Sequence, residues 1–236
     1  MTTIGKQTFV LVHGAWYGAW AWHKVASGLR EMGHTVTTPT LTGQGERKRC
    51  GNDTATLTTH IDDIVDHIMM EDLQEVTLVG WSYGGMVITG VLARIPEKIK
   101  SVIYLDAYVP GDGKTFMDYT LPVVSALFEE YKQNDQAIPP MPWEFMGVDD
   151  QEVIDFVSPR QVSHPWRTLY EPAKVLPWPS GMPISYIWCT RTMFLKDIME
   201  GMKQDARVRL ELLDGNHLCM LTAPDETIEI LAKLAE

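Results

Sequence analysis

The sequence predicts an α/β fold in which a mostly parallel, doubly wound sheet is covered by helices on both faces. Short β-branched and aliphatic runs alternate with longer amphipathic stretches, and Gly or Pro stands at many of the boundaries. The alternation breaks once, between residues 110 and 183. With 236 residues, 45% of them apolar, the chain can bury one sizeable core, so we expect a single domain over residues 1–236.

The N-terminal part of the chain begins the alternation. The run 9–12 (FVLV) is apolar throughout and predicts a buried strand. The stretch 20–32 predicts a helix that ends at Gly33, because glycine adopts the left-handed conformation common after a last helical turn. A strand is expected over 35–38, followed by a glycine-containing loop over 42–50.

The clearest helix of the sequence is predicted over 57–72. Its apolar positions fall on one stripe at helical spacing: Leu57, Ile61, Ile64, Val65 and Ile68. A strand over 76–80, a helix over 83–94 that ends before Pro96, and a strand over 101–105 follow. This strand–helix–strand order is typical of parallel sheets.

The C-terminal part resumes the same alternation, with strands over 184–189 and 208–213 and helices over 195–204 and 226–235. The intervening segment 110–183 holds eleven of the fourteen prolines. Because proline interrupts both helices and β-ladders, we expect this segment to be a cap, inserted from one edge of the sheet and folded over its top.

Composition excludes several classes of function. The formal net charge of −11 disfavours nucleic-acid binding, and no run of roughly 18 to 20 apolar residues could cross a bilayer. The three cysteines, Cys50, Cys189 and Cys219, form no CxxC pair, so neither a disulfide framework nor a structural zinc site is expected. The first residues lack the apolar core of a signal peptide, and we therefore expect a cytoplasmic protein.

A candidate nucleophile lies between the strand 76–80 and the helix that follows it. The run Gly80-Trp81-Ser82-Tyr83-Gly84 matches the pattern G-x-S-x-G in the strand–turn–helix context that this pattern requires. A sharp turn there lifts the Ser82 hydroxyl above the sheet, and glycines on either side let the neighbouring chains pass closely. Ser82 is therefore predicted to be a nucleophile.

A base for this serine is expected in the loop after the last strand. His217 lies there, in the run Leu213-Asp214-Gly215-Asn216-His217, just before the final helix. The other histidines are elsewhere in the chain: His13, His23, His34, His60, His67 and His164. Because a serine hydroxyl is a poor nucleophile until an adjacent base takes its proton, His217 is the predicted partner of Ser82.

Two backbone amides are expected to stabilise a developing oxyanion. One belongs to Tyr83, the residue after the nucleophile, and the other to Ala15, in the loop after the first strand. His13 ends that strand, so we expect it to be packed and hydrogen-bonded rather than catalytic.

No residues suggest a metal or nucleotide site. His60, Asp63 and His67 lie near one face of the helix 57–72 but lack the HExxH arrangement, so we expect a solvated helix flank. Neither G-x-G-x-x-G nor G-x-x-x-x-G-K-[ST] is present, and serine chemistry needs no metal or organic cofactor.

Together these motifs resemble the α/β-hydrolase superfamily, and more narrowly the branch of plant methyl esterases, hydroxynitrile lyases and small bacterial esterases. The runs that carry the resemblance are FVLVHGAWYGAWAW, LTGQGER, LVGWSYGGMVI, YLDAYVP and GNHLCML. It implies an α/β-hydrolase fold with the cap after the strand ending near Leu105, and it makes a homodimer plausible. It also implies Ser82 as nucleophile, His217 as base and the amides of Ala15 and Tyr83 as the oxyanion hole.

Departures from the lyase pattern favour hydrolysis. The resembling lyases have a lysine after the catalytic histidine and a threonine after the first-strand histidine, whereas this chain has Leu218 and Gly14. The lysine assists departure of cyanide, so its absence argues against that reaction.

A carboxylate is expected to complete a catalytic triad with Ser82 and His217. Where plant members of this branch carry a carboxylate, after the strand 184–189, this chain has Thr192. Some α/β-hydrolases place the acid one strand earlier, where Asp106 ends the strand 101–105. We therefore predict Asp106 as the acid, with Asp197 as the alternative.

Four apolar residues are expected to line a substrate pocket: Trp16, Phe116, Met141 and Trp143. The predicted activity is that of a carboxylesterase-like serine hydrolase acting on a small ester, carbamate, amide, lactone or thioester through an acyl-enzyme. Two other classes stay open: lyase or cofactor-free oxygenase chemistry on the same scaffold, and a non-catalytic ligand receptor.

Overall fold

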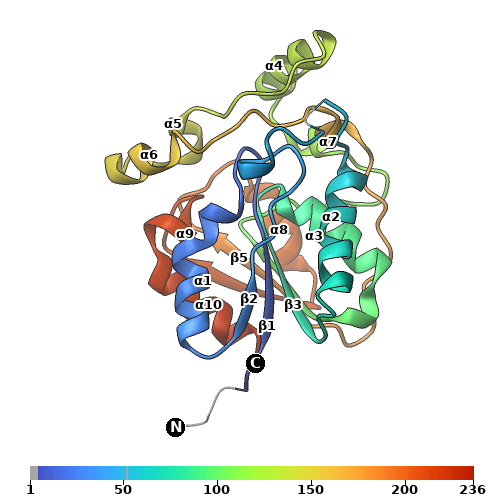
Figure 1. The fold of residues 1–236 in the computed structure, drawn as a ribbon, viewed down its shortest axis with the longest axis vertical. Coiled ribbons are helices and arrows are strands. Elements are labelled where there is room, and N and C mark those ends of the chain that lie inside the picture. The colour runs from blue at the N-terminus through green and yellow to red at the C-terminus, as the bar shows by residue number, and fades with distance from the viewer. Residues whose placement is uncertain (1–4, 52) are drawn as a thin grey trace.

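The computed structural model describes residues 5–51 and 53–236 and contains one sheet of six strands (Figure 1). The strands are β1 (Thr8–Val12), β2 (Thr35–Thr37), β3 (Val76–Trp81), β4 (Ile99–Leu105), β5 (Ile184–Cys189) and β6 (Val208–Leu213). Their order is β2-β1-β3-β4-β5-β6, and every neighbouring pair is parallel. The strand order changes direction at β1, so a crevice is expected beyond the carboxyl ends of β1 and β3.

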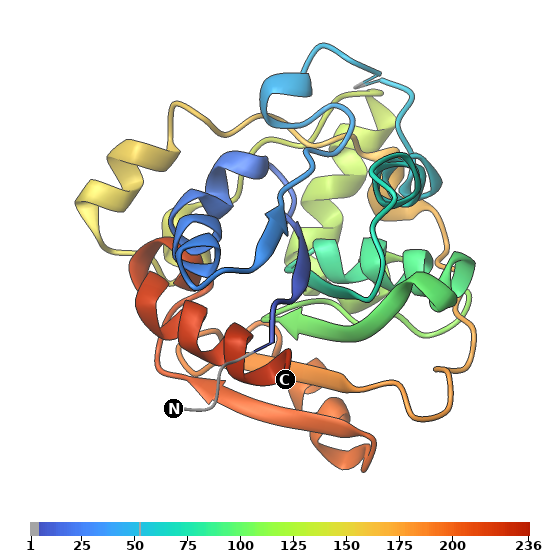
Figure 2. The same cartoon turned by 60° about the horizontal axis from the view of Figure 1, so that its bottom comes forward.

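Helices cover both faces of this sheet. On one face α1 (His23–Glu31) contacts α10 (Pro224–Leu234), and on the other α2 (Leu57–Met70) contacts α3 (Gly84–Arg94), as Figures 1 and 2 show. The helix α8 (Lys196–Gln204) packs against β5 and β6. The predicted α/β class, with a mostly parallel sheet, is confirmed. Among the helices of the described residues, none has the length and apolar character that a bilayer crossing requires.

Element boundaries differ from the predicted ones by a few residues, for local reasons. The predicted helix 20–32 begins as a 3-10 turn, η1 (Ala19–Trp22), and becomes α-helical only in α1. The last helix begins at Pro224 instead of 226, because proline in the first turn lacks only an N–H that has no helical partner. The helix α2 begins at a capping box in which Thr56 and Thr59 bond each other's backbone amides.

The cap, residues 110–183, lies between β4 and β5 in the chain and across the top of the sheet in Figure 1. It contains one short 3-10 helix and four α-helices: η4 (Phe116–Tyr119), α4 (Pro122–Gln133), α5 (Trp143–Met146), α6 (Gln151–Val157) and α7 (Arg167–Tyr170). Its two extended passages meet in an antiparallel bridge between Ile138 and His164. The cap therefore comes from a single insertion above the carboxyl ends of the strands.

Candidate active site

Ser82 stands on the sharp turn between β3 and α3, which begins at Gly84. Its φ of 55° lies in the left-handed region that residues with a Cβ rarely adopt. The turn is held by backbone hydrogen bonds on both sides. The Ser82 N–H donates to the Leu105 carbonyl (3.3 Å), and the Ser82 carbonyl accepts from the N–H of Tyr108 and of Gly85 (both 3.0 Å).

Glycines are needed around this turn because backbone passes too close for a side chain. A Cβ added at Gly80 would lie 2.7 Å from the Gly84 carbonyl oxygen, and one at Gly84 would lie 2.7 Å from the carbonyl oxygen of Val12. A Cβ atom essentially never lies so close to a neighbouring backbone oxygen. The G-x-S-x-G pattern is thus explained by close packing of β1, β3 and α3.

Three side chains form a continuous hydrogen-bonded chain at this turn. The distance from Ser82 Oγ to His217 Nε2 is 2.9 Å, and the distance from His217 Nδ1 to Asp106 Oδ2 is 2.7 Å. An ionised carboxylate only accepts, so Nδ1 carries the imidazole proton and Nε2 accepts from the Ser82 hydroxyl. His217 and Asp106 are buried, whereas Ser82 keeps 8% of its surface exposed.

Both partners of this chain are held in place. His217 lies in the loop after β6, where its carbonyl accepts from Trp81 Nε1 (2.8 Å) and its ring meets that of Phe194 edge-on at 4.9 Å. Asp106 Oδ1 accepts from the backbone N–H of Cys189 at 3.2 Å. These contacts fix the imidazole and the carboxylate independently of Ser82.

Neither Asp197, the alternative acid, nor Thr192, at the position where the resembling plant enzymes carry a carboxylate, is hydrogen-bonded to His217. Asp197 is exposed in the first turn of α8. Thr192 is buried, and its Oγ1 has no hydrogen-bond partner within the part of the chain that the structure describes. The structure therefore brings Asp106, and neither alternative, to the imidazole.

The loop after β1 packs directly against the nucleophile. A Cβ at Gly14 would lie 2.8 Å from Ser82 Cβ. The Leu41 N–H donates to His13 Nε2 (3.1 Å), so Nδ1 carries the proton and donates to the Gly14 carbonyl (2.8 Å). Because C=O and N–H of a trans peptide point in opposite directions, the Ala15 N–H points away from His13. Burial lowers the pKa of His13 to about 4, so its ring is neutral, and it is packed and hydrogen-bonded as predicted.

Tyr83 precedes the first turn of α3, so its N–H lies at the positive end of that helix. In residues 5–51 and 53–236, neither this amide nor that of Ala15 donates to a protein acceptor.

The Tyr83 hydroxyl donates to His60 Nδ1 (2.9 Å), and His60 Nε2 donates to the Thr42 carbonyl (2.8 Å). The expected solvated flank is therefore wrong for His60, which is fully buried and whose pKa burial lowers to about 4.

A cavity opens from the Ser82 hydroxyl toward the cap. The cavity contains about 480 Å³ of space that no protein atom fills, and part of this space is open to solvent. The lining residues are Ala15, Trp16, Ser82, Tyr108, Phe116, Tyr119, Thr120, Leu121, Val124, Phe128, Met141, Phe145, Met146, Phe194 and His217. The lining is mostly apolar and aromatic, with a few hydroxyl groups, as in sites for small organic molecules.

Of the four predicted pocket residues, Trp16, Phe116 and Met141 line this cavity, and Trp143 does not. Trp143 begins the short helix α5, whose residues Phe145 and Met146 line the cavity instead. Successive helical residues are rotated by about 100°, so Trp143 and Phe145 lie on opposite sides of α5. Met146 is on the same side of α5 as Trp143 and also lines the cavity, so the prediction placed the correct segment at the pocket and chose the wrong residue within it.

Several lining residues were missed by the sequence analysis. Tyr108 and Phe194 lie in the loops after β4 and β5, and this position alone would have suggested them, since ligands bind beyond the carboxyl ends of parallel strands. Phe128 lies within α4, and nothing in the sequence indicates which face of this helix turns inward. Within the described residues, no group of three or more His, Cys, Asp or Glu is placed to hold a metal ion.

The fold and this hydrogen-bonded site define a class that a comparison with protein families also finds. Residues 9–230 match the profile described as "Alpha/beta hydrolase family", and the chain belongs to this family. The resemblance inferred from the sequence motifs is therefore confirmed.

Relatives within the family include bacterial and plant esterases. The carbendazim hydrolyzing esterase of Nocardioides sp. (strain SG-4G) is 54% identical over 109 residues, which are 46% of this chain and 45% of that protein. Methyl jasmonate esterase 1 of Vitis vinifera is 33% identical over 134 residues, which are 56% of this chain and 48% of that protein. The chain thus spans about half the length of the curated relatives it matches.

Solved structures are similar over nearly the whole chain. An extracellular alpha/beta-hydrolase from a Paenibacillus species, reported to share structural and functional homology with tobacco salicylic acid binding protein 2, has a TM-score of 0.84 and 26% identity, with 97% of this chain and 98% of that chain covered. Polyneuridine aldehyde esterase has a TM-score of 0.73 and 22% identity, with 98% and 100% covered. The likeness to polyneuridine aldehyde esterase shows the fold alone.

Proposed function

We propose that this protein is a serine hydrolase that cleaves small apolar esters and related carbamates through an acyl-enzyme on Ser82. The observation that carries the proposal is the buried chain of hydrogen bonds from Ser82 through His217 to Asp106, which ends at an apolar cavity. Activation of a serine hydroxyl requires a base within hydrogen-bonding distance and a third group that orients the base, and all three are present.

The first half of the reaction forms the acyl-enzyme. Ser82 Oγ attacks the carbonyl carbon while its proton passes to His217 Nε2, and the Asp106 carboxylate stabilises the resulting imidazolium. The N–H groups of Ala15 and Tyr83 donate to the oxyanion of the tetrahedral intermediate. When the intermediate collapses, the bond to the leaving group breaks and His217 returns the proton to that group.

The second half releases the acid. Water takes the place of the leaving group, gives a proton to His217 and attacks the acyl carbon, and Ser82 Oγ leaves with the proton from His217. The two steps use the same amides and the same imidazole. Every proton transfer is thus accounted for by side chains of this chain and by water.

The cavity supports a substrate with an apolar, aromatic group. Aromatic rings from both the core and the cap face it, among them Trp16, Phe116 and Phe194. The likeness to an esterase named for carbendazim, an aromatic methyl carbamate, favours methyl carbamates and methyl esters of planar aromatic compounds. We expect purified protein to hydrolyse carbendazim with a lower KM than p-nitrophenyl acetate, because its fused ring system offers more apolar area to these aromatic side chains than a single nitrophenyl ring does.

Ser82→Ala tests the proposal directly. It removes the nucleophile, so we expect kcat for p-nitrophenyl acetate to fall by at least about 10³-fold and labelling by a fluorophosphonate probe to disappear. Ser180→Ala, at an exposed position of the cap, is the matched control and should match the wild type. Full activity and full labelling of Ser82→Ala would reject the proposed function.

A further inference from the structure

Trp16 follows the Ala15 amide directly and has an unusual backbone conformation. Its φ is 69°, in the left-handed region that favours glycine, yet its side chain is 5% exposed and lines the cavity. A large residue keeps such a conformation only where surrounding contacts hold it. The contacts that hold Trp16 therefore also constrain the Ala15–Trp16 peptide, which is joined through the Ala15 Cα to the peptide that carries the Ala15 N–H.

Those contacts come from the cap. The indole Nε1–H donates to the Ile138 carbonyl at 2.8 Å, and the Trp16 carbonyl accepts from the Val162 N–H at 3.1 Å. Ile138 and His164 are paired through two backbone hydrogen bonds of 2.8 Å, so Trp16 is attached to both passages of one small antiparallel ladder. The indole also meets the rings of Phe128 and His164 at centroid distances of 6.3 and 6.0 Å.

The Ala15 amide thus lies between two fixed points. On its N-terminal side, His13 donates to the Gly14 carbonyl and fixes the peptide that carries the Ala15 N–H. On its C-terminal side, Trp16 is attached to the cap through one side-chain and one backbone hydrogen bond. A displacement of the cap ladder would be transmitted through Trp16 to the amide.

We propose that Trp16 is a positioning residue that couples the cap to the oxyanion-binding amide of Ala15, so that the cap sets the alignment of this amide as well as the shape of the pocket. This inference rests on the proposed function. According to this inference, Trp16 affects the stability of the transition state. A residue that only lines the pocket would instead affect mainly the binding of substrate.

Trp16→Phe is the first test, because it keeps an aromatic ring and removes only the indole N–H and part of the ring area. We expect kcat for p-nitrophenyl acetate to fall about tenfold while KM changes less than about threefold, since a misaligned oxyanion donor weakens the transition state more than the ground state. The affinity for phenyl trifluoromethyl ketone, which adds to a serine oxygen to give a tetrahedral oxyanion, should also fall about tenfold.

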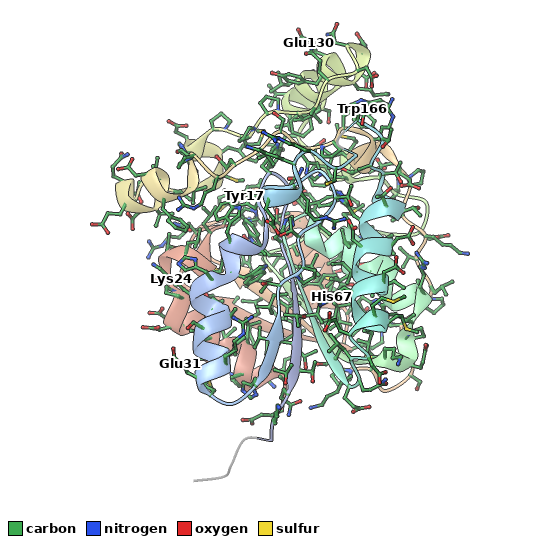
Figure 3. The ribbon with its side chains drawn as sticks, viewed as in Figure 1. Tyr17, Lys24, Glu31, His67, Glu130 and Trp166 are labelled. Carbon is green, nitrogen blue, oxygen red and sulfur yellow. The ribbon has the colours of Figure 1, made fainter. Side chains whose placement is uncertain are left out.

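The matched control is Trp166→Phe. Trp166 also donates an indole hydrogen bond within the cap, to Asp135 Oδ1 at 2.9 Å, but it immediately precedes α7 and lies apart from Tyr17 of the first loop in Figure 3. It should leave kcat, KM and the affinity for the trifluoromethyl ketone unchanged. Equal losses in both variants would mean that general loosening of the cap, and no specific link through Trp16, is responsible, and would overturn the inference.

Val162→Pro approaches the same link from the cap side, because proline has no N–H to donate to the Trp16 carbonyl. Val162→Pro should lower the affinity for the trifluoromethyl ketone, as Trp16→Phe does. If circular dichroism shows that Trp16→Phe does not fold, Val162→Pro alone tests the link between the cap and the Ala15 amide. A change confined to KM, or no change, in the folded variant overturns the inference. If the wild type itself neither turns over ester nor binds the ketone, the proposed function fails instead.

Discussion

Two of the three hydrogen-bonded side chains stand on backbone that L-amino acids rarely adopt. The φ of Ser82 is 55° and that of Asp106 is 43°. Each such residue costs on the order of 1–3 kcal/mol, and the cost persists only where other contacts fix the conformation. The Asp106 N–H donates to the Ile187 carbonyl at 2.7 Å, so neighbouring strands hold the acid as they hold the nucleophile.

At the residue scale, Asp106→Asn should nearly abolish turnover. The amide cannot stabilise the imidazolium and favours the wrong imidazole tautomer, so we expect kcat to fall roughly 10³- to 10⁴-fold. Asp197→Asn, on the exposed turn of α8, should stay within about twofold of the wild type. Steady-state kinetics on both variants check this, and a large loss confined to Asp197→Asn would refute the assignment of the acid.

His60 makes stability depend on pH. Burial lowers its pKa from 6.5 to about 4, so the unfolded chain takes up the proton first as the pH falls. The contribution of the neutral, buried His60 to the free energy of unfolding is fully present above about pH 6.5 and is lost as the pH falls through about 4. Between pH 7 and 4.5 the group accounts for a loss of about 2 kcal/mol in the free energy of unfolding.

His60→Gln should remove that dependence, because glutamine is neutral at both pH values. Urea unfolding at pH 7 and 4.5 should show a loss about 2 kcal/mol smaller than in the wild type, whatever the variant's stability at pH 7. His23→Gln, at an exposed histidine of α1, is the control and should follow the wild type. Identical pH slopes for the wild type and His60→Gln would contradict the account.

The residue scale also shows what the sequence could and could not predict. Position 60 is three residues after Leu57 and four before Ile64, so the apolar stripe of α2 could have predicted the burial of His60, which we expected on a solvated flank. The choice between Asp106 and Asp197 depended instead on which loop meets His217. That contact joins residues 111 positions apart, and no local pattern determines it.

At the element scale, the packing of β1, β3 and α3 makes Gly80 indispensable. An added methyl group would lie 2.7 Å from the Gly84 carbonyl, so Gly80→Ala should lower the free energy of unfolding by about 1–3 kcal/mol and displace the Ser82 turn. Gly201→Ala, in α8 with nothing within 4 Å of the added carbon, should instead raise it by up to about 1 kcal/mol. Chemical denaturation of both variants tests the contrast, and equal effects would contradict it.

The core elements were predictable because their patterns are long and local. The strand β3 is buried at every position and consists mainly of β-branched and apolar residues. The cap helices α5 and α7 have four residues each, too few to show a helical period, and their conformation depends on contacts with the rest of the fold. The prolines and the break in the strand–helix alternation therefore predicted an insertion between β4 and β5, but its internal structure and its inward face could not be inferred.

At the scale of the whole molecule, the site is assembled from loops that only the parallel sheet brings together. Ala15 follows β1, Ser82 follows β3, Asp106 follows β4 and His217 follows β6. Because all six strands run in one direction, every one of these loops emerges at the same edge, beneath the cap (Figure 1). The common direction of the strands, rather than proximity in sequence, brings these loops to one edge. Because β4 and β5 lie between β3 and β6, the loop after β6 reaches back along this edge to place His217 beside Ser82.

The most direct test of this account is the reaction of the purified protein with excess p-nitrophenyl acetate, followed by rapid-mixing absorbance and by peptide mapping of the acid-quenched mixture. We predict a burst of p-nitrophenolate equal in amount to the enzyme, followed by a slower steady rate, with the acetyl group on Ser82. Turnover with no covalent intermediate, or an acetyl group found only on another residue, would contradict the proposed mechanism.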